Sequence, residues 1–265
     1  MFAALVLAGR NKIYSTMRQN VIHLEQFYAS RLGVAAREMV VRRLDNLWPD
    51  LAGCDVLGYG YGWPYLSSYS AQAKRIILAM PGEQGAIAQT SRRGVIACLT
   101  EDHQLPFADN SFDHIFVAHG VEEAPDLPAL LKELWRVTRP EGRIVIVASN
   151  RSGLWARSDA TPFGAGRPFS RTQLRGALRG AGFVPTVWSG ALFVPPMRRL
   201  SHGSTVRGFE KFGETVWPSF SGVVLVEALK RLYAETPGIK SQLVMRPSFG
   251  AAPIGKPAAN RDTKT

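Results

Sequence analysis

Short apolar runs separated by amphipathic stretches predict a sheet whose strands alternate with helices. Four of these runs are typical of buried strands, and they cover residues 55–57, 75–80, 95–99 and 112–118. A continuous β-branched run over 143–148 indicates a strand that is buried on both faces. Strands that alternate with helical segments predict a parallel, doubly wound α/β sheet.

Helical spacing surrounds these runs. Apolar residues recur at steps of three to five from Val21 to Leu47, and Gly33 is expected to divide this stretch into two helices. The same spacing predicts a helix over 126–138, followed by a turn at 140–142. Ser170 is suited to cap a helix that follows it.

The C-terminal part continues the pattern less regularly. Residues 151–167 are rich in Gly, Ser, Pro and Arg, and we expect a loop over the ligand-binding edge of the sheet. Further elements are expected as a helix over 171–179, a strand over 183–188, a helix near 205–216 and a strand over 222–233. The residues from about 237 show no clear period and predict a disordered tail.

Composition excludes several classes of protein. The chain has 265 residues, 46% of them hydrophobic, so a sizeable core can form and global disorder is excluded. No stretch approaches the roughly 20 apolar residues of a membrane span. The N-terminal apolar stretch is short and has no basic residue before it, so we expect no secretory signal and a cytoplasmic protein. Cys54 and Cys98 form no zinc motif and are interpreted as reduced, buried thiols.

Positive charge is concentrated in one part of the chain. Residues 1–150 carry 15 basic and 15 acidic residues, whereas residues 151–265 carry 17 basic and 6 acidic ones, the whole excess of +11. This asymmetry favours an anionic partner, which would be a nucleic acid, an anionic membrane surface or a phosphorylated substrate. Frequent arginine codons in a GC-rich genome are the alternative explanation.

A glycine-rich turn follows the first predicted strand. Its glycines are Gly58, Gly60 and Gly62. Glycines allow a tight turn and the close approach of a ligand, and ligands of open α/β sheets bind beyond the carboxyl ends of the strands. A plain strand-to-helix turn is the alternative. The neighbouring Tyr61, Trp63 and Tyr65 are either an aromatic wall for a ligand or apolar cover for the sheet.

A family resemblance rests on two ordered segments. Residues 105–113 read LPFADNSFD, and residues 131–143 read LKELWRVTRPEGR. Together they resemble the class I S-adenosylmethionine-dependent methyltransferases, in the broad subgroup that includes the quinone-biosynthesis C-methyltransferases. The resemblance covers about residues 53–150. It implies a Rossmann-like methyltransferase sheet. Together with the apolar spacing and the charge, the prediction is such a sheet with N-terminal helices and a basic C-terminal extension.

The resemblance also divides the chain and places a cofactor. We expect an N-terminal helical segment over 1–50, a methyltransferase-like domain over 51–236 and a disordered tail over 237–265. S-adenosylmethionine would bind at the carboxyl ends of the first four strands of the sheet. The residues implied there are Gly58, Tyr59, Gly60, Gly62, Met80, Glu101, Asp102 and His119.

Individual roles follow from the family pattern. Glu101 matches the acid after the third strand, on the adenine side, and Asp102 is adjacent to it. His119 matches the residue after the fourth strand that often lies beside the cofactor, and it is the candidate general base. Glu122 and Glu123 are interpreted mainly as part of a solvated helix start, where acids are favourable.

Two carboxylates of the family pattern are missing. Gly58 stands where the first motif has an acid that orients the methionine end of the cofactor, and Pro64 replaces the third glycine. The acid that binds the ribose would fall near Met80, and no carboxylate occurs between Asp55 and Glu83. Loss of one charge-assisted hydrogen bond would cost about 1.5–3 kcal/mol of binding free energy. Glu83 is the nearest replacement.

Three functions remain open on these grounds. The first is an S-adenosylmethionine-dependent methyltransferase with an unidentified acceptor. Arg151, Arg157 and Arg167 favour an acceptor that is anionic. The second is a non-catalytic binding or regulatory protein with a degenerate cofactor site. The third is a nucleic-acid-binding protein that uses the basic half, whose binding would fall steeply with salt. The acceptor, the methylated atom and the oligomeric state cannot be predicted from these residues.

Overall fold

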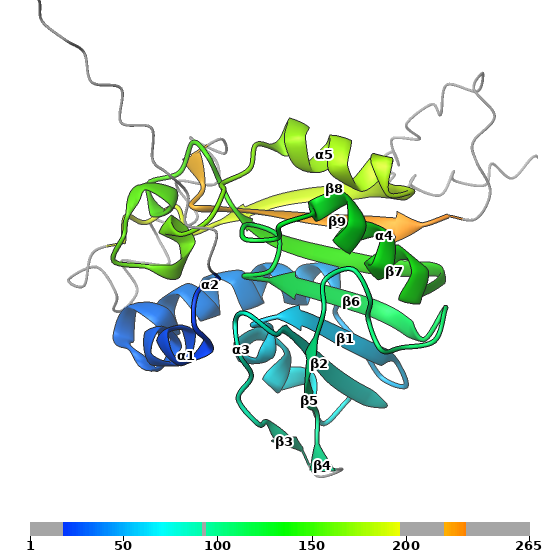
Figure 1. The fold of residues 1–265 in the computed structure, drawn as a ribbon. Coiled ribbons are helices and arrows are strands. Elements are labelled where there is room, and N and C mark those ends of the chain that lie inside the picture. The colour runs from blue at the N-terminus through cyan, green and yellow to red at the C-terminus, as the bar shows by residue number, and fades with distance from the viewer. Residues whose placement is uncertain (1–17, 92–93, 197–219, 232–265) are drawn as a thin grey trace, which may run out of the picture. The chain divides into compact units, whose positions relative to one another are not determined.

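A computed structural model of the protein describes residues 18–91, 94–196 and 220–231 (Figure 1). Within these ranges seven strands form one sheet in the order β5-β2-β1-β6-β7-β9-β8. The strands are β1 (Asp55–Gly60), β2 (Arg75–Pro81), β5 (Ala97–Thr100), β6 (Phe112–Ala118), β7 (Thr138–Ser149), β8 (Phe183–Ala191) and β9 (Val223–Lys230). A separate hairpin pairs β3 (Thr90–Ser91) with β4 (Gly94–Val95).

The strand directions confirm the doubly wound α/β sheet except at β9. Neighbouring strands from β5 to β7 pair in parallel. β9 departs from the predicted parallel arrangement, because it runs antiparallel to both β7 and β8. Antiparallel neighbours need no crossover helix between them, and β9 can therefore insert beside β7 late in the chain.

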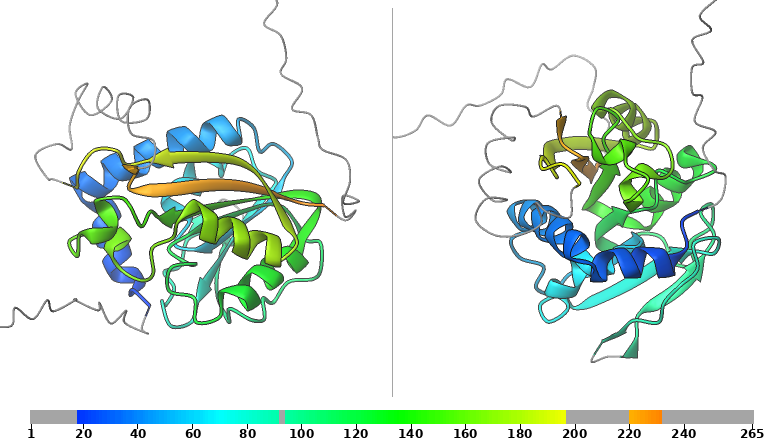
Figure 2. Two further views of the ribbon diagram at one scale, coloured as in Figure 1. Left: turned by 90° about the horizontal axis from the view of Figure 1, so that it is seen from above. Right: turned by 90° about the vertical axis from the view of Figure 1, so that its left-hand side faces the viewer.

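Helices cover both faces of the sheet (Figures 1 and 2). One core cluster joins the sheet to α1 (Val21–Ala29), α2 (Arg31–Leu47) and the one-turn α3 (Trp63–Leu66). A second cluster, on the other face, joins it to α4 (Leu127–Val137) and α5 (Arg171–Gly180). Short 3-10 turns are η1 (Ser67–Tyr69), η2 (Trp155–Arg157) and η3 (Pro162–Gly164).

The division between the first two helices lies at Ser30 and not at Gly33, so that prediction is wrong. The Ser30 hydroxyl accepts from the Gly33 amide at 3.1 Å and donates to the Phe27 carbonyl at 2.6 Å, which ends α1 and begins α2. Gly33 instead permits a close approach of the two helices, because a Cβ there would lie 1.9 Å from the Phe27 oxygen. The predicted cap of α5 is confirmed, and Ser170 forms a capping box with Gln173.

Three strand boundaries also differ from the prediction. The run over 95–99 is split, because Val95 belongs to the β3–β4 hairpin and β5 begins at Ala97. Residues 140–142, expected as a turn, lie within β7, and the last strand ends at Lys230. The expected helix near 205–216 and the expected tail lie outside the described residues.

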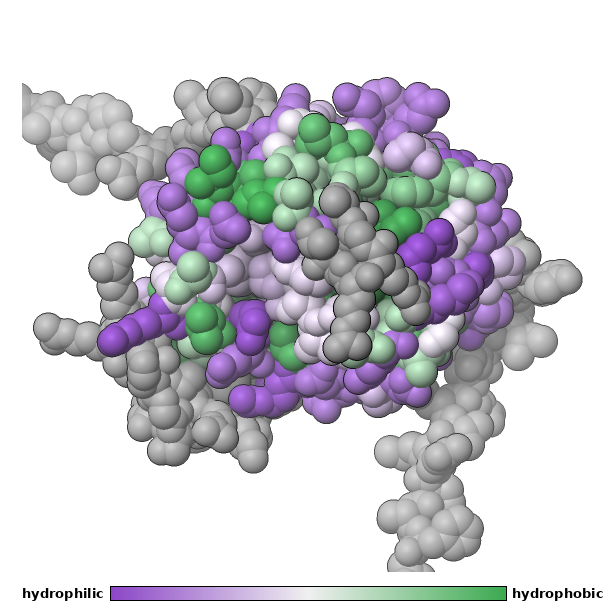
Figure 3. Space-filling view, turned by 90° about the horizontal axis from the view of Figure 1, so that it is seen from below, coloured by the Kyte–Doolittle hydropathy of each residue, from purple (hydrophilic) through white to green (hydrophobic). Residues whose placement is uncertain are grey.

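Surface features of the described part are ordinary for a folded domain. None of its helices is both long enough and apolar enough to cross a bilayer. Patches of hydrophobic residues lie among hydrophilic ones on the face seen from below (Figure 3). Cys54 and Cys98 are free thiols, and both are half-buried where the sequence predicted buried ones.

Buried charged side chains form ion pairs and hydrogen bonds between elements at the amino edge of the sheet. Asp55, at the start of β1, accepts from Lys74, Arg75 and Arg139 at 3.0–3.2 Å. Lys230, at the end of β9, is 2% exposed. Its ammonium donates to the carbonyls of Thr138 and Trp135 and to the Asn110 side chain at 2.7–2.8 Å. These carbonyls lie at the C-terminal end of α4, where a cation is favourable.

Replacement of Lys230 by methionine tests this anchor. Lys230→Met leaves three acceptors without their charged donor, and we expect the free energy of unfolding to fall by about 2–3 kcal/mol. Urea denaturation measures the change. Lys74→Met is the control, because its side chain is 62% exposed and Asp55 keeps both arginines. The control should lose less than about 1 kcal/mol, and equal losses in the two variants would contradict the assignment.

Candidate active site at the carboxyl edge of the sheet

The segment before α1 and α1 itself cross the carboxyl edge of the sheet, which faces the viewer in the right-hand view of Figure 2. The Gln19 amide donates to the Glu123 carboxylate at 2.9 Å, and the Val21 amide donates to the Gln84 carbonyl at 2.9 Å. The Gln84 side chain donates to the His119 carbonyl at 3.1 Å. The N-terminal segment therefore joins the loops that follow β2 and β6.

Asp102, after β5, is the polar centre of this edge. Its carboxylate accepts from the Arg18 guanidinium and from the Tyr59 hydroxyl. Arg18 is 6% exposed and also donates to the Gly120 carbonyl at 3.1 Å. Burial, followed by the charge of Asp102, holds the pKa of Tyr59 well above its usual range. The phenol therefore stays neutral and acts as a donor.

A cavity of about 440 Å³ opens beside this ion pair. Four carboxylates and one guanidinium are among its lining groups. The lining consists of Arg18, Pro81, Gly82, Glu83, Thr100, Glu101, Asp102, His103, Pro125 and Asp126. Glu101 is exposed, and its carboxylate has no bonding partner among the described side chains. The cavity can therefore offer free acceptors to the hydroxyl or amine groups of a ligand.

The turn after β1 is packed directly on the end of β6. The Tyr61 amide donates to the Ala118 carbonyl at 2.9 Å. Gly60 has a φ of +75°, and a Cβ there would lie 2.3 Å from the same Ala118 oxygen. His119 faces it in the left-handed region as well, with a φ of +51°. Only glycine can occupy position 60, because any side chain would collide with backbone atoms.

Gly58 has a packing reason of its own. A Cβ at this position would lie 2.8 Å from the methyl groups of both Leu66 and Leu78. The place of the family's first carboxylate is therefore filled by two leucine side chains. A carboxylate there would be forced into apolar surroundings, where an unpaired charge is strongly unfavourable.

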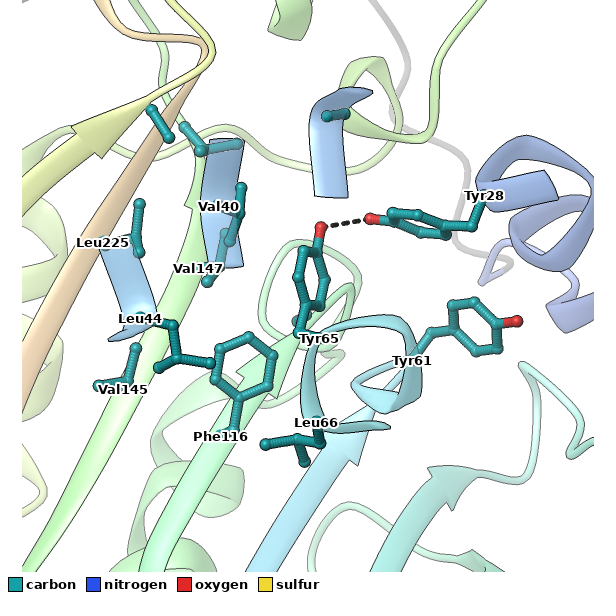
Figure 4. Close-up of a cluster of buried hydrophobic side chains, with 14 of the residues drawn as sticks. Tyr28, Val40, Leu44, Tyr61, Tyr65, Leu66, Phe116, Val145, Val147 and Leu225 are labelled. Carbon is teal, nitrogen blue, oxygen red and sulfur yellow. Dashed lines mark hydrogen bonds between the residues drawn. The ribbon is translucent and has the colours of Figure 1, made fainter. Parts of the chain in front are cut away.

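Three buried polar side chains meet next to the glycine turn, and Figure 4 shows two of them, Tyr28 and Tyr65. The Tyr28 hydroxyl shares hydrogen bonds with the Tyr65 hydroxyl at 2.5 Å and with His119 Nε2 at 2.6 Å. Tyr61 packs against Tyr28 with ring centroids 5.8 Å apart. Tyr61 and Tyr65 both lie in the core cluster, which favours the interpretation of these aromatic residues as cover for the sheet. Burial raises the pKa of Tyr61 to about 12 and that of Tyr65 further.

Burial also displaces the pKa values of His119 and Glu122. Burial lowers the pKa of His119 to about 4, so its imidazole is neutral at pH 7. Burial raises the pKa of the Glu122 carboxyl to about 7. Glu122 Oε1 accepts from the Ser149 amide at 2.8 Å and from the Ser149 hydroxyl at 3.3 Å, whereas Oε2 has no partner in the described part of the chain. Glu122 is thus buried and does not lie on the solvated helix start that was predicted.

The eight residues expected to bind the cofactor lie on the strands β1 and β2 or just beyond the ends of β1, β5 and β6. Only Glu101 and Asp102 among them line the cavity. Met80 is fully buried in β2 and Tyr59 in β1, so their side chains belong to the core. The sequence reasoning missed Arg18 and Tyr28. No local signal marks either residue, because their partners lie 37–102 positions away.

The three arginines proposed to bind an anion lie in the loop between β7 and α5. Arg151, Arg157 and Arg167 are all exposed. Arg167 lies over the Phe169 ring at 6.0 Å. It also lines a second cavity of about 350 Å³ that shares Pro125 and Asp126 with the first.

Residues 54–146 match the family described as "Methyltransferase domain". Over these residues, which contribute the parallel part of the sheet, the chain is similar to that family. A demethylmenaquinone methyltransferase from Corynebacterium glutamicum is 38% identical over 76 residues, which cover 29% of this chain and 33% of that protein. One from Corynebacterium urealyticum is 33% identical over 110 residues, which cover 42% and 46%. The chain therefore spans less than half the length of these relatives.

A solved structure shows the same fold. It is a SAM-dependent methyltransferase from Thermotoga maritima, with a TM-score of 0.57 and 19% identity. The alignment covers 80% of this chain and 96% of the other. This likeness confirms the predicted Rossmann-like fold of the described sheet and its helices.

The methyltransferase domain fits S-adenosylmethionine in part. The cavity lined by Glu101 and Asp102 fits a group that carries hydroxyl and amine donors, as the adenosine part of the cofactor does. On the methionine side, the carboxylate of the family pattern is replaced by Gly58 under two leucines. The remaining groups there are the backbone of the glycine turn and the His119 region. The domain would therefore hold the methionine end without that carboxylate.

The packing at Gly58 predicts that the family's acid cannot simply be restored. Gly58→Asp would displace the methyl groups of Leu66 and Leu78 and bury a charge, so we expect a loss of about 2–4 kcal/mol in the free energy of unfolding. Urea denaturation measures it. Gly58→Ala is the matched control, because it meets the same contacts without the charge. An aspartate variant as stable as the wild type would contradict the prediction, because Leu66 and Leu78 would then be able to move aside.

The pKa of Glu122 predicts a pH dependence of stability. In the folded protein the carboxyl keeps its proton up to about pH 7, whereas an unfolded glutamate loses it near pH 4.3. Its contribution to stability is therefore complete below about pH 4.3 and is lost as the pH rises through about 7. Glu122→Gln should gain about 2–3 kcal/mol on the wild type between pH 4.5 and 7.5.

Urea unfolding of both proteins across this range measures the difference. The lowered pKa of His119 gives the opposite slope, but His119 is common to both proteins, so its effect cancels. Parallel stability curves would contradict the shifted pKa of Glu122.

Proposed function

We propose that this protein is an S-adenosylmethionine-dependent methyltransferase that binds the adenosine part of the cofactor in the cavity beside Glu101 and Asp102. The observation that carries the proposal is the position of this cavity. It opens at the carboxyl ends of β2 and β5. All its lining residues except Arg18 lie within the range that matches the methyltransferase family. In open α/β sheets this edge is the usual ligand site.

The bound cofactor would supply the methyl group on its sulfonium. The chain would orient the cofactor and the acceptor and would exclude water from the site. Glu101 would accept hydrogen bonds from the adenosine part. The Arg18–Asp102–Tyr59 contacts would hold the wall of the cavity in place. Gly58, Gly60, Gly62 and Met80 would act through the backbone, because they have no side chain or a buried one. His119, neutral and bonded to Tyr28, would lie beside the methionine end.

Glu122 is the better candidate for the base that His119 was expected to provide. His119 Nε2 already bonds the Tyr28 hydroxyl, and its lowered pKa makes it a weak base. Glu122 has a free oxygen and a pKa of about 7, which suits proton acceptance near neutral pH. This assignment applies to an acceptor that loses a proton when it is methylated.

The acceptor is proposed only as a class. Relatives of the matched segment are named for demethylmenaquinone, so small aromatic ring compounds of the quinol type are the first group to screen. The exposed Arg151, Arg157 and Arg167 favour acceptors with an anionic group. The cytoplasm is the proposed location.

A non-catalytic binding protein is the second candidate. It is favoured by the filled position of the first carboxylate and by the absence of an acid between Asp55 and Glu83. It is also favoured by Arg18, which occupies one face of Asp102. Such a protein would keep the fold but bind the cofactor weakly or not at all.

Calorimetric titration with S-adenosylmethionine and S-adenosylhomocysteine distinguishes the two candidates. We expect micromolar binding, and Glu101→Gln should weaken it by about tenfold without a change in thermal stability. Glu38→Gln is the matched control, since Glu38 is an exposed acid on α2 that does not line the cavity. No binding of either compound up to about 1 mM would favour the non-catalytic protein.

A further inference from the structure

Three segments of the chain meet at the carboxyl ends of β7 and β8 and the start of the antiparallel β9, on the half of the sheet away from the cavity. The Asn150 side chain donates to the Ser221 carbonyl at 2.8 Å, and the Trp155 indole donates to the Val194 carbonyl at 2.7 Å. The Gly222 amide donates to the Leu192 carbonyl at 3.0 Å. These bonds join the loop after β7, the end of β8 and the start of β9 into one support.

This support is packed tightly. Trp155 is 1% exposed, and a Cβ on Gly222 would lie 2.4 Å from its ring. A Cβ on Gly153 would lie 2.4 Å from the Ser221 carbonyl oxygen. The loop after β7 and the start of β9 therefore touch with no side chain between them.

Two large apolar side chains project from this support into solvent. Leu154 is 51% exposed and Phe220 is 61% exposed. Their chain neighbours Gly153 and Ser221 are in contact, so both lie at one place on the surface. We call Leu154 and Phe220 the apolar tip. Exposed apolar side chains that lie together and are rimmed by polar residues can mark an interaction site, whereas isolated ones do not.

The surroundings of the apolar tip are basic. Arg151 and Arg157 are exposed on the same loop, within three positions of Leu154. The loop over residues 151–167 carries three basic side chains and one acidic side chain. The acids of the cavity, in contrast, follow β2, β5 and β6, on the other half of the edge. The carboxyl edge is thus acidic at one end and basic with apolar side chains at the other.

We propose that the apolar tip is a docking surface for an anionic phospholipid membrane. Leu154 and Phe220 would enter the headgroup region, and Arg151 and Arg157 would contact lipid phosphates. Apolar side chains flanked by arginines match the apolar interior and the charged headgroups of such a membrane. The free energy from burial of apolar area and that from attraction to anionic lipid add together. A nucleic acid would use the arginines but would leave the two apolar side chains without a role.

Co-sedimentation of the full chain with vesicles tests the proposal without any need for activity. We expect pelleting with vesicles of phosphatidylcholine and phosphatidylglycerol (3:1), and much less with phosphatidylcholine alone. The double variant Leu154→Ser/Phe220→Ser should bind the anionic vesicles at least about tenfold more weakly. The matched control is Leu99→Ser, because Leu99 is 58% exposed on β5, at the opposite edge of the sheet.

A charge series completes the test. Arg151→Gln/Arg157→Gln should weaken binding to anionic vesicles and reduce its dependence on salt. The control is Arg179→Gln, an exposed arginine at the C-terminal end of α5. Thermal unfolding of each variant confirms that the fold is kept.

Several outcomes would overturn the proposal. Equal vesicle binding by wild type and the tip double variant would place any lipid binding elsewhere in the basic half. Absence of wild-type binding to both kinds of vesicle would exclude the surface. Salt-sensitive binding to a 20-base-pair DNA duplex without vesicle binding would assign the positive charge to nucleic acid instead.

Discussion

The Asp102 carboxylate holds together three parts of the chain that are distant in sequence. Arg18 reaches it from the segment before α1, and Tyr59 reaches it from within β1. Because Arg18 and Tyr59 are both buried, each depends on this carboxylate for a hydrogen bond that water would otherwise supply. The cavity has its present shape because this ion pair fixes one of its walls. Binding at the edge therefore depends on an interaction made by the chain itself.

The altered glycine motif follows from packing as much as from function. Gly58 lies under Leu66 and Leu78, and Leu66 is in the single turn of α3. A carboxylate at this position needs space, and in this protein leucine side chains fill that space. The departure is therefore consistent across several residues and is not a single isolated substitution. Either the methionine end is held in another way or the domain has lost the need to hold it.

Much of the fold could be predicted from the sequence, because buried parallel strands and amphipathic helices leave strong periodic signals. The sheet, α4 and the capped α5 follow from such patterns. The break at Ser30 and the split before β5 were missed because they arise from local contacts, a serine cap and a short hairpin, which the apolar spacing does not record. Glu101, Asp102 and His119 were recognised by their place in a motif. Arg18, Tyr28 and the buried state of Glu122 arise only from tertiary contacts.

The two outer strands of the sheet limit how copies of this protein can associate. β8 contains Pro185, which has no amide hydrogen to donate, and its pairing with β9 shifts register between Pro185 and Val187. β5, at the other edge, has only four residues. Short, interrupted or proline-containing edges are poor templates for a strand from another molecule. Self-association of the described domain would consequently use side-chain surfaces, and extension of the sheet from one copy into the next is disfavoured at both ends.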